Sequence, residues 1–94
     1  MKPLESWVEK KFVDQVKKDF GAKVVKFRDA AQVGAPDRIV LLPGGKVVFI
    51  ELKREGKTAR KSQLRYIDTL LSLGFVVHIC DNWKDAYEAV RRAA

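Results

Sequence analysis

The hydrophobic positions of the chain change spacing several times, and the changes predict three helices and four strands. Residues 4–20 carry apolar side chains every three or four positions, which predicts a first helix ending before Gly21. A second helix is expected over residues 58–73, with Thr58 as its N-cap. A closing helix is expected over residues 82–92.

Four short apolar runs between these helices predict the strands of one sheet. They span residues 23–27, 37–42, 46–52 and 75–80. Pro43-Gly44-Gly45 is typical of the turn of a hairpin, here between the second and third strands. A hairpin followed by strand, helix and strand requires a mixed sheet. The expected fold class is therefore α/β, a mixed β-sheet flanked by helices in the order αβββαβα, and without a linker or repeat we expect one domain over residues 1–94.

The composition of the chain indicates what kind of partner it binds and in which compartment it is located. The net charge is +7, from 19 Lys and Arg against 12 Asp and Glu, which favours a polyanion such as nucleic acid. The single cysteine excludes an internal disulfide framework and a cysteine-based zinc site. The sequence has neither a signal-peptide pattern nor an apolar run of membrane-spanning length, so we expect an intracellular protein with no membrane partner.

Basic residues gather after the third predicted strand. They are Lys53, Arg54, Lys57, Arg60, Lys61 and Arg65, with Glu55 as the one acid among them. Such a run is compatible with a solvated helix start, and equally with contacts to a phosphate backbone.

Several polar residues lie where the hydrophobic pattern calls for apolar ones. They are Glu9 and Glu5 on the first helix, Asp37 at the second strand, Glu51 and Lys53 on the third strand, and Gln63 on the second helix. Each alone has a structural explanation, since a glutamate at a stripe edge reaches solvent and an aspartate after proline suits a turn. Together they indicate a site built by several elements.

The length of the hairpin turn decides whether two of these residues meet. If all three residues Pro43–Gly45 form the turn, Leu42 lies opposite Lys46 and Asp37 opposite Glu51. A two-residue turn would direct Asp37 away unless a bulge restored the pairing, and the hydrophobic pattern does not choose between the two registers. Opposed carboxylates destabilise a hairpin, but a divalent cation between them would reverse that effect.

This combination of groups suits metal-assisted phosphodiester hydrolysis. Converging carboxylates with a backbone carbonyl bind hard ions such as Mg²⁺ or Mn²⁺. Such an ion polarises a phosphodiester and lowers the pKa of bound water, and a neighbouring lysine stabilises charge developing on phosphorus. The basic run just downstream would bind the DNA or RNA backbone.

Three segments carry a family resemblance. They are "VEKKFVDQVKK" at 8–18, "GAPDRIVLLPGGKVVFIELK" at 34–53 and "ARKSQ" at 59–63. In this order the chain resembles the PD-(D/E)xK nuclease superfamily and, within it, the VRR-NUC (virus-type replication-repair nuclease) domain. The resemblance covers essentially the whole chain and implies a restriction-endonuclease-like fold.

The resemblance also implies a role for each unusual polar residue. The catalytic set would be Glu9, Asp37, Glu51, Lys53 and Gln63. Of these, Asp37 and Glu51 would bind Mg²⁺ or Mn²⁺ together with the carbonyl of Leu52. Glu9 would complete the site directly or through metal-bound water, with Glu5 as the alternative. Gly34 fits the family's tight approach to the aspartate.

The same resemblance implies a substrate, an assembly and a location. Short proteins of this kind resemble phage or bacterial enzymes that act as homodimers on branched DNA, such as four-way (Holliday) junctions, in the cytoplasm of a bacterium or phage-infected cell. The nucleic-acid contacts would come from Arg54, Lys57, Arg60, Lys61 and Arg65. Two alternatives remain open at this point: a catalytically silent binding module with the nuclease fold, and a nuclease for single-stranded or flap substrates.

Overall fold

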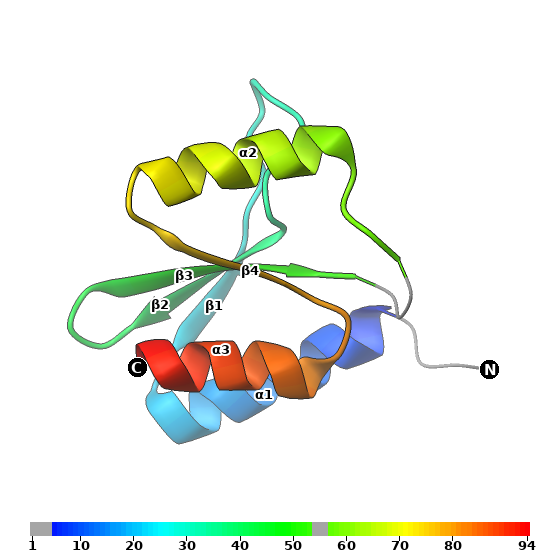
Figure 1. Ribbon diagram of the computed structural model, residues 1–94. Coiled ribbons are helices and arrows are strands. Elements are labelled where there is room, and N and C mark those ends of the chain that lie inside the picture. The colour runs from blue at the N-terminus through cyan, green and yellow to red at the C-terminus, as the bar shows by residue number, and fades with distance from the viewer. Residues whose placement is uncertain (1–4, 54–56) are drawn as a thin grey trace.

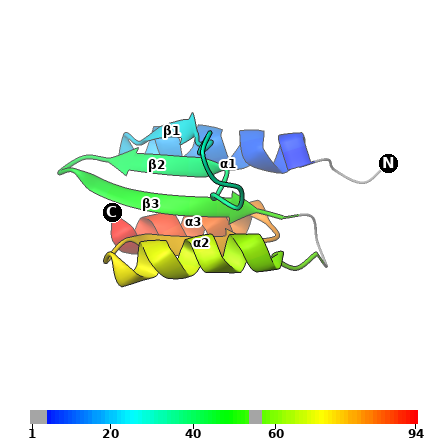
Figure 2. The same cartoon turned by 90° about the horizontal axis from the view of Figure 1, so that it is seen from above.

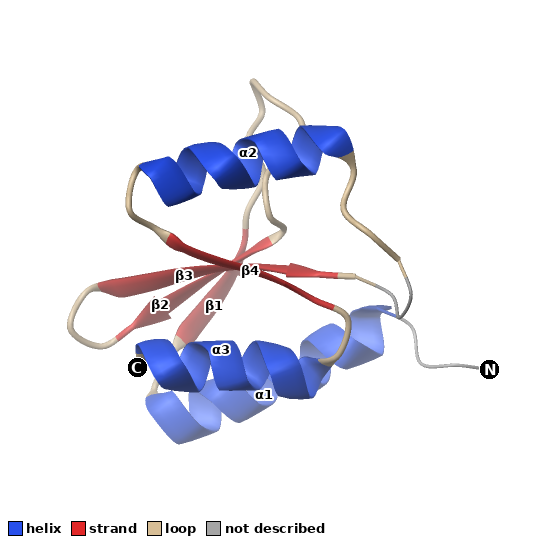
Figure 3. Cartoon of the chain, viewed as in Figure 1, coloured by secondary structure: helices blue, strands red, loops and turns tan. Residues whose placement is uncertain are grey.

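A computed structural model describes residues 5–53 and 57–94, with side chains from Glu9 onward. The helices are α1 (Glu5–Phe20), α2 (Lys61–Ser72) and α3 (Trp83–Ala93). The strands are β1 (Lys23–Lys26), β2 (Arg38–Leu42), β3 (Lys46–Leu52) and β4 (Val76–Cys80). The predicted order αβββαβα is confirmed (Figure 3).

The four strands form one mixed sheet in the order β1-β2-β3-β4. The two pairs β1–β2 and β2–β3 are antiparallel, whereas β3 and β4 are parallel, as the crossover through α2 requires. Helix α2 covers one face of the sheet, and α1 and α3 cover the other (Figure 1). Seen from above, the β2–β3 turn lies at one end of the sheet and the chain leaves β3 at the other end (Figure 2).

The face toward α1 and α3 holds the main core. Alternate residues of β2 and β3 point to this face, as strand geometry requires, and Val40, Val48 and Ile50 have no exposed surface. They pack with Phe12 and Val16 of α1, which are also fully buried.

The opposite face packs against α2 through aromatic rings. Phe49 of β3 lies 5.9 Å from Phe27 and 5.3 Å from Phe75 between ring centroids, in edge-on geometry. Phe27 in turn contacts Tyr66 of α2. This layer sets the height at which α2 lies above the strands.

The hairpin has the three-residue turn. Leu42 pairs with Lys46, and the same register continues to Arg38 opposite Ile50. Gly44 and Gly45 both have positive φ, which a tight turn requires and which other residues rarely adopt. One step beyond the last pair, Asp37 and Glu51 lie opposite each other, so the register that brings them together is confirmed.

Two helix starts differ from the sequence prediction. Thr58 is not an N-cap, because residues 57–60 are not helical and α2 begins at Lys61 after the N-cap Arg60. Asn82 is the N-cap of α3 rather than its first residue, and its side chain accepts a hydrogen bond from the Asp85 backbone N–H. Within the part of the chain that is described, every helix is too short or too polar to span a membrane.

Candidate active site

Four of the predicted site residues meet at the end of the sheet opposite the hairpin turn. Asp37 immediately precedes β2, Glu51 is near the end of β3, Lys53 follows β3, and Gln63 lies in the first turn of α2. Glu51 and Lys53 are two residues apart in an extended segment, so both side chains point toward the α2 face of the sheet.

The Glu51 carboxylate is the centre of this cluster and is only 6% exposed. Its Oε1 accepts a hydrogen bond from the Asp37 backbone N–H at 3.1 Å. Its Oε2 accepts one from the Gln63 side-chain amide at 3.0 Å and forms an ion pair with Lys53 Nζ at 3.2 Å. A buried carboxylate is tolerated only with such partners, and here they come from three different segments.

Gln63 connects this carboxylate to the beginning of α2. Its amide nitrogen binds Glu51, and its Oε1 accepts a hydrogen bond from the Arg60 backbone N–H at 2.9 Å. The side chain is 4% exposed and lies on the buried side of α2 with Ile67 and Leu70, as its helical spacing predicts. One amide therefore both caps the helix and positions Glu51.

The backbone of Asp37 is held at both of its polar groups. Its N–H binds Glu51, while its carbonyl accepts hydrogen bonds from the Phe27 N–H at 2.9 Å and the Arg38 guanidinium at 3.0 Å. Pro36 before it is fully buried. The side-chain oxygen Oδ1 of Asp37 is also buried. The carboxylate is thus presented from a fixed backbone beside Glu51.

Gly34 secures the same loop to α2. Its φ is +101°, and a Cβ at this position would lie 2.3 Å from the Ser62 carbonyl oxygen. Only glycine permits this approach, because any side chain would meet backbone that belongs to the first turn of a helix. The tight packing predicted for Gly34 exists, although the surface it approaches is α2 rather than Asp37 itself.

Glu9 lies on the other face of the sheet and pairs with Arg38. The Arg38 side chain alternates along β2 with Val40 and Leu42, so it points toward α1, where its guanidinium meets the Glu9 carboxylate. Burial lowers the pKa of Arg38, and the neighbouring Glu51 acts in the opposite direction. Since Arg38 also donates to the Asp37 carbonyl, Glu9 is connected to the cluster through Arg38.

The predicted nucleic-acid-binding residues are only partly within the described chain. Lys57, Arg60, Lys61 and Arg65 are exposed at the start of α2, next to the cluster. Arg54 and the Glu5 side chain lie outside what the structure describes.

Sequence reasoning missed Arg38. The available signal was a charged residue at a buried position of an apolar strand, in phase with Val40 and Leu42. Adjacent residues of a strand point to opposite faces, so Arg38 lies on the α1 side of the sheet although Asp37 beside it belongs to the cluster on the α2 side.

The donor set fits a hard divalent cation. A carboxylate has about four lone-pair positions. Glu51 uses two on Oε2 and one on Oε1, which leaves capacity on the oxygen nearest Asp37. Asp37 and Glu51 bring two carboxylates to this place, and among the described side chains no group of three His, Cys, Asp or Glu residues converges. Mg²⁺ and similar ions accept such incomplete sets because they retain several waters.

Known proteins resemble this chain in sequence and in fold. It is 38% identical over 78 residues to "Putative nuclease p44" of Acyrthosiphon pisum secondary endosymbiont phage 1, covering 83% of each protein. A solved structure described as "VRR_NUC domain" superposes with a TM-score of 0.82 at 26% identity, covering 96% of this chain and 97% of the other. A second, "VRR_NUC domain protein", has a TM-score of 0.77 at 18% identity, covering 99% and 90%. No protein-family model matches the sequence.

Proposed function

Because the chain belongs to the VRR-NUC family of nuclease domains, we propose that residues 1–94 form a single metal-dependent endonuclease domain that hydrolyses DNA phosphodiester bonds. The observation that supports this is the Glu51 carboxylate, which is buried beside Asp37 and held by Lys53 and Gln63. Stability does not require such an arrangement at the end of a strand, because replacing buried ion pairs with apolar residues is often neutral or stabilising in proteins.

Each residue then has a defined part in binding Mg²⁺ or Mn²⁺. Asp37 and Glu51 would hold the ion with their carboxylates, and the backbone carbonyl of Leu52 would be the third protein ligand. When bound, the ion polarises the phosphodiester and lowers the pKa of a coordinated water. Gln63 holds Glu51 in the orientation that ligation requires. Glu9 acts on the site by orienting Arg38, which fixes the carbonyl of Asp37.

Lys53 serves the reaction itself. Its ammonium is 3.2 Å from Glu51 and its side chain is 17% exposed, so it can reach a phosphate placed at the carboxylates. In the hydrolysis a water oxygen bonds to phosphorus, the bond from phosphorus to one ester oxygen breaks, and that oxygen leaves with a proton. Lys53 donates hydrogen bonds to the phosphoryl oxygens as negative charge accumulates on them.

The basic residues at the start of α2 would bind the phosphate backbone of the DNA. Lys57, Arg60, Lys61 and Arg65 are exposed there, and Arg54 precedes them in the sequence. Each phosphate neutralised by such a residue contributes to the salt dependence of binding. Branched DNA, including four-way junctions, is the proposed substrate, and a homodimer with two such sites would match the symmetry of a junction. The proposed location is the cytoplasm of a bacterium or a phage-infected cell.

The test is cleavage of end-labelled linear, single-stranded, flap, splayed and four-way DNA with Mg²⁺ or Mn²⁺. Strand cleavage that is lost in excess chelator and restored by metal is expected, with the four-way substrate cut most efficiently. Metal-insensitive cleavage, or salt-dependent binding without any cleavage, would contradict the proposal. Preference for single-stranded or flap DNA would support the proposed nuclease activity but contradict the four-way junction as its substrate. Light scattering of the purified protein tests the homodimer.

Two pairs of variants separate catalysis from folding. Asp37→Asn retains the backbone N–H that binds Glu51, so the fold should persist while cleavage is lost. Asp68→Asn is its control, an equal change of charge at an exposed position of α2. Lys53→Met should also abolish cleavage, whereas Lys46→Met, at the exposed other end of β3, should not. Thermal unfolding of all four variants verifies that lost activity does not reflect lost structure.

A further inference from the structure

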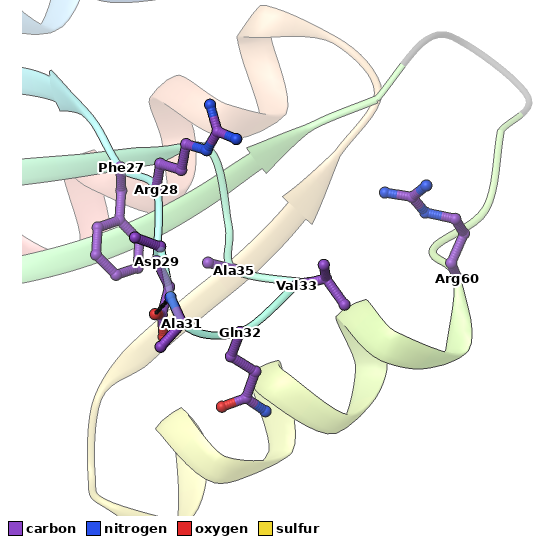
Figure 4. Close-up of a pocket in the computed structure, with 10 residues that line it drawn as sticks. Phe27, Arg28, Asp29, Ala31, Gln32, Val33, Ala35 and Arg60 are labelled. Atoms are coloured by element: carbon purple, nitrogen blue, oxygen red, sulfur yellow. Dashed lines mark hydrogen bonds between the residues drawn. The ribbon is translucent and has the colours of Figure 1, made fainter.

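A pocket of about 360 Å³ opens beside the proposed active site. The loop between β1 and β2 forms most of its wall and Arg60 completes it (Figure 4). Much of the wall consists of alanine and glycine, so the backbone curves around the space and little side-chain volume fills it. Figure 4 shows Arg28 on one side of the loop and Arg60 on the other.

The loop is held in this shape by α2. The Asp29 carboxylate accepts a hydrogen bond from the Tyr66 hydroxyl at 2.8 Å and another from the Ala31 N–H at 2.9 Å. Further along the loop, Gly34 packs against the Ser62 carbonyl. With both halves attached to one helix, the pocket is formed before any ligand arrives, which lowers the ordering cost of binding.

The loop and Arg60, which form the two walls of the pocket, are each connected to one of the carboxylates Asp37 and Glu51. Ala35 of the loop is two residues before Asp37, and the Arg60 N–H binds Gln63, which binds Glu51. The loop and the helix start that line the pocket are therefore the same two segments that hold Asp37 and Glu51.

The chemistry of the lining indicates which part of a nucleic acid fits. Arg28 and Arg60 are both exposed, and guanidinium groups bind phosphate through paired hydrogen bonds. The Gln32 amide offers a donor and an acceptor, as the edge of a base requires. The volume lies near the lower end of the range for small-molecule sites, which suits one nucleotide rather than a stacked pair.

We propose that this pocket receives one unpaired nucleotide of the DNA substrate, adjacent to the phosphodiester that is cut, with Arg28 and Arg60 at the phosphates on its two sides. The inference rests on the proposed nuclease function and adds a reason for selectivity. A paired nucleotide must be unstacked to enter the pocket, whereas a nucleotide at a branch, bulge or mismatch is already partly released. The pocket thus favours imperfectly paired DNA without contacts to a whole junction.

The experiment uses one duplex sequence, either fully paired or with a single bulged nucleotide moved stepwise along one strand. The wild-type protein with Mg²⁺ should cut the bulged duplexes at a constant offset from the bulge, about tenfold or more faster in kcat/KM than the paired duplex. Equal rates, or an offset that varies with bulge position, would overturn the pocket proposal. Cleavage of no substrate at all would overturn the nuclease proposal instead.

Two variants link the preference to the pocket. Ala31→Phe fills the pocket from an exposed position and keeps the Ala31 N–H, so it should remove the bulge preference while paired duplex is still cut. Ala94→Phe adds the same ring at the end of α3 and should leave the preference intact. Arg28→Gln should reduce the preference more than Lys26→Gln, an equal loss of charge on nearby β1. Unchanged preference in both Ala31→Phe and Arg28→Gln would refute the assignment.

Ligand binding to the pocket can also be measured without catalysis, through the unfolding temperature of the protein. A deoxynucleoside 3′,5′-bisphosphate should raise the unfolding temperature of the wild-type protein, and Ala31→Phe should abolish that rise. Inorganic phosphate is the comparison probe: an equal rise with phosphate alone would show an anion site rather than a nucleotide pocket and would overturn the proposal.

Discussion

Replacing Gly34 by alanine tests how the active-site loop is attached to α2. The residue has a φ of +101°, and an added Cβ would lie 2.3 Å from the Ser62 carbonyl oxygen. Positive φ in a residue other than glycine costs about 1–2 kcal/mol. Relieving the clash requires a backbone shift of the loop or of the first turn of α2, and overpacking of this kind costs about 1–3 kcal/mol more.

The expected loss of unfolding free energy for Gly34→Ala is therefore about 2–5 kcal/mol, from the sum of these two effects. Gly44 provides the matched control, since its φ is +84° but nothing lies within 4 Å of its virtual Cβ. Gly44→Ala should cost only about 1–2 kcal/mol, from the backbone alone. Urea unfolding of both variants measures the difference, which reports the contact with Ser62.

The same contact bears on activity, because Ser62 precedes Gln63 and Gln63 holds Glu51. In Gly34→Ala, nuclease activity should fall further than the folded fraction does, whereas Gly44→Ala should lose activity only in proportion to unfolding. Equal unfolding free energies for the two variants would refute the close approach. A destabilised Gly34→Ala with full activity per folded molecule would refute its link to the active site.

Further substitutions test other parts of the structure. Arg38→Met should lower the unfolding free energy by about 3 kcal/mol in urea titration, because it leaves the Glu9 carboxylate and a backbone carbonyl without their buried cation; no loss would show that the ion pair is dispensable. The Tyr66 hydrogen bond lowers the pKa of Asp29 below 3.8, so it stabilises the fold above that pH and less as pH falls through the lower folded value. The unfolding midpoint of Tyr66→Phe should thus fall less steeply with decreasing pH in the acid range than the midpoint of the wild-type protein. Burial raises the pKa of Cys80 to about 11, so Ellman's reagent at neutral pH should react with it only as the protein unfolds.

The β2–β3 hairpin is the part of the site that local sequence patterns could predict. The turn residues, the two apolar runs and strand geometry together bring Asp37 opposite Glu51, and the register confirms the three-residue turn. Lys53 joins them because extended residues two apart share a face. These placements follow from short stretches of chain, so the sequence alone was sufficient to predict them once the turn length was assumed.

Side-chain contacts between different helices and strands could not be predicted from these local patterns. The periodicity of α2 predicted that Gln63 is buried, but not that it binds Glu51 and the Arg60 N–H, and the N-cap was wrongly assigned to Thr58. The pairing of Arg38 with Glu9 was likewise unforeseen. Each of these contacts depends on the height and rotation at which a helix packs on the sheet.

Short-range patterns were enough to predict the order of the elements and the placement of Lys53 on the same face as Glu51, since both depend on backbone geometry within a few residues. The opposition of Asp37 and Glu51 followed from them only if the hairpin turn had three residues, and the strand register of the structure settled that point. Only the tertiary structure decided which groups hold Glu51, which face Glu9 occupies, and that the loop before Asp37 encloses a pocket. The physical reason is that contacts between distant segments are selected by packing of the whole core, where Gly34 against Ser62 and the aromatic layer under α2 set the distances.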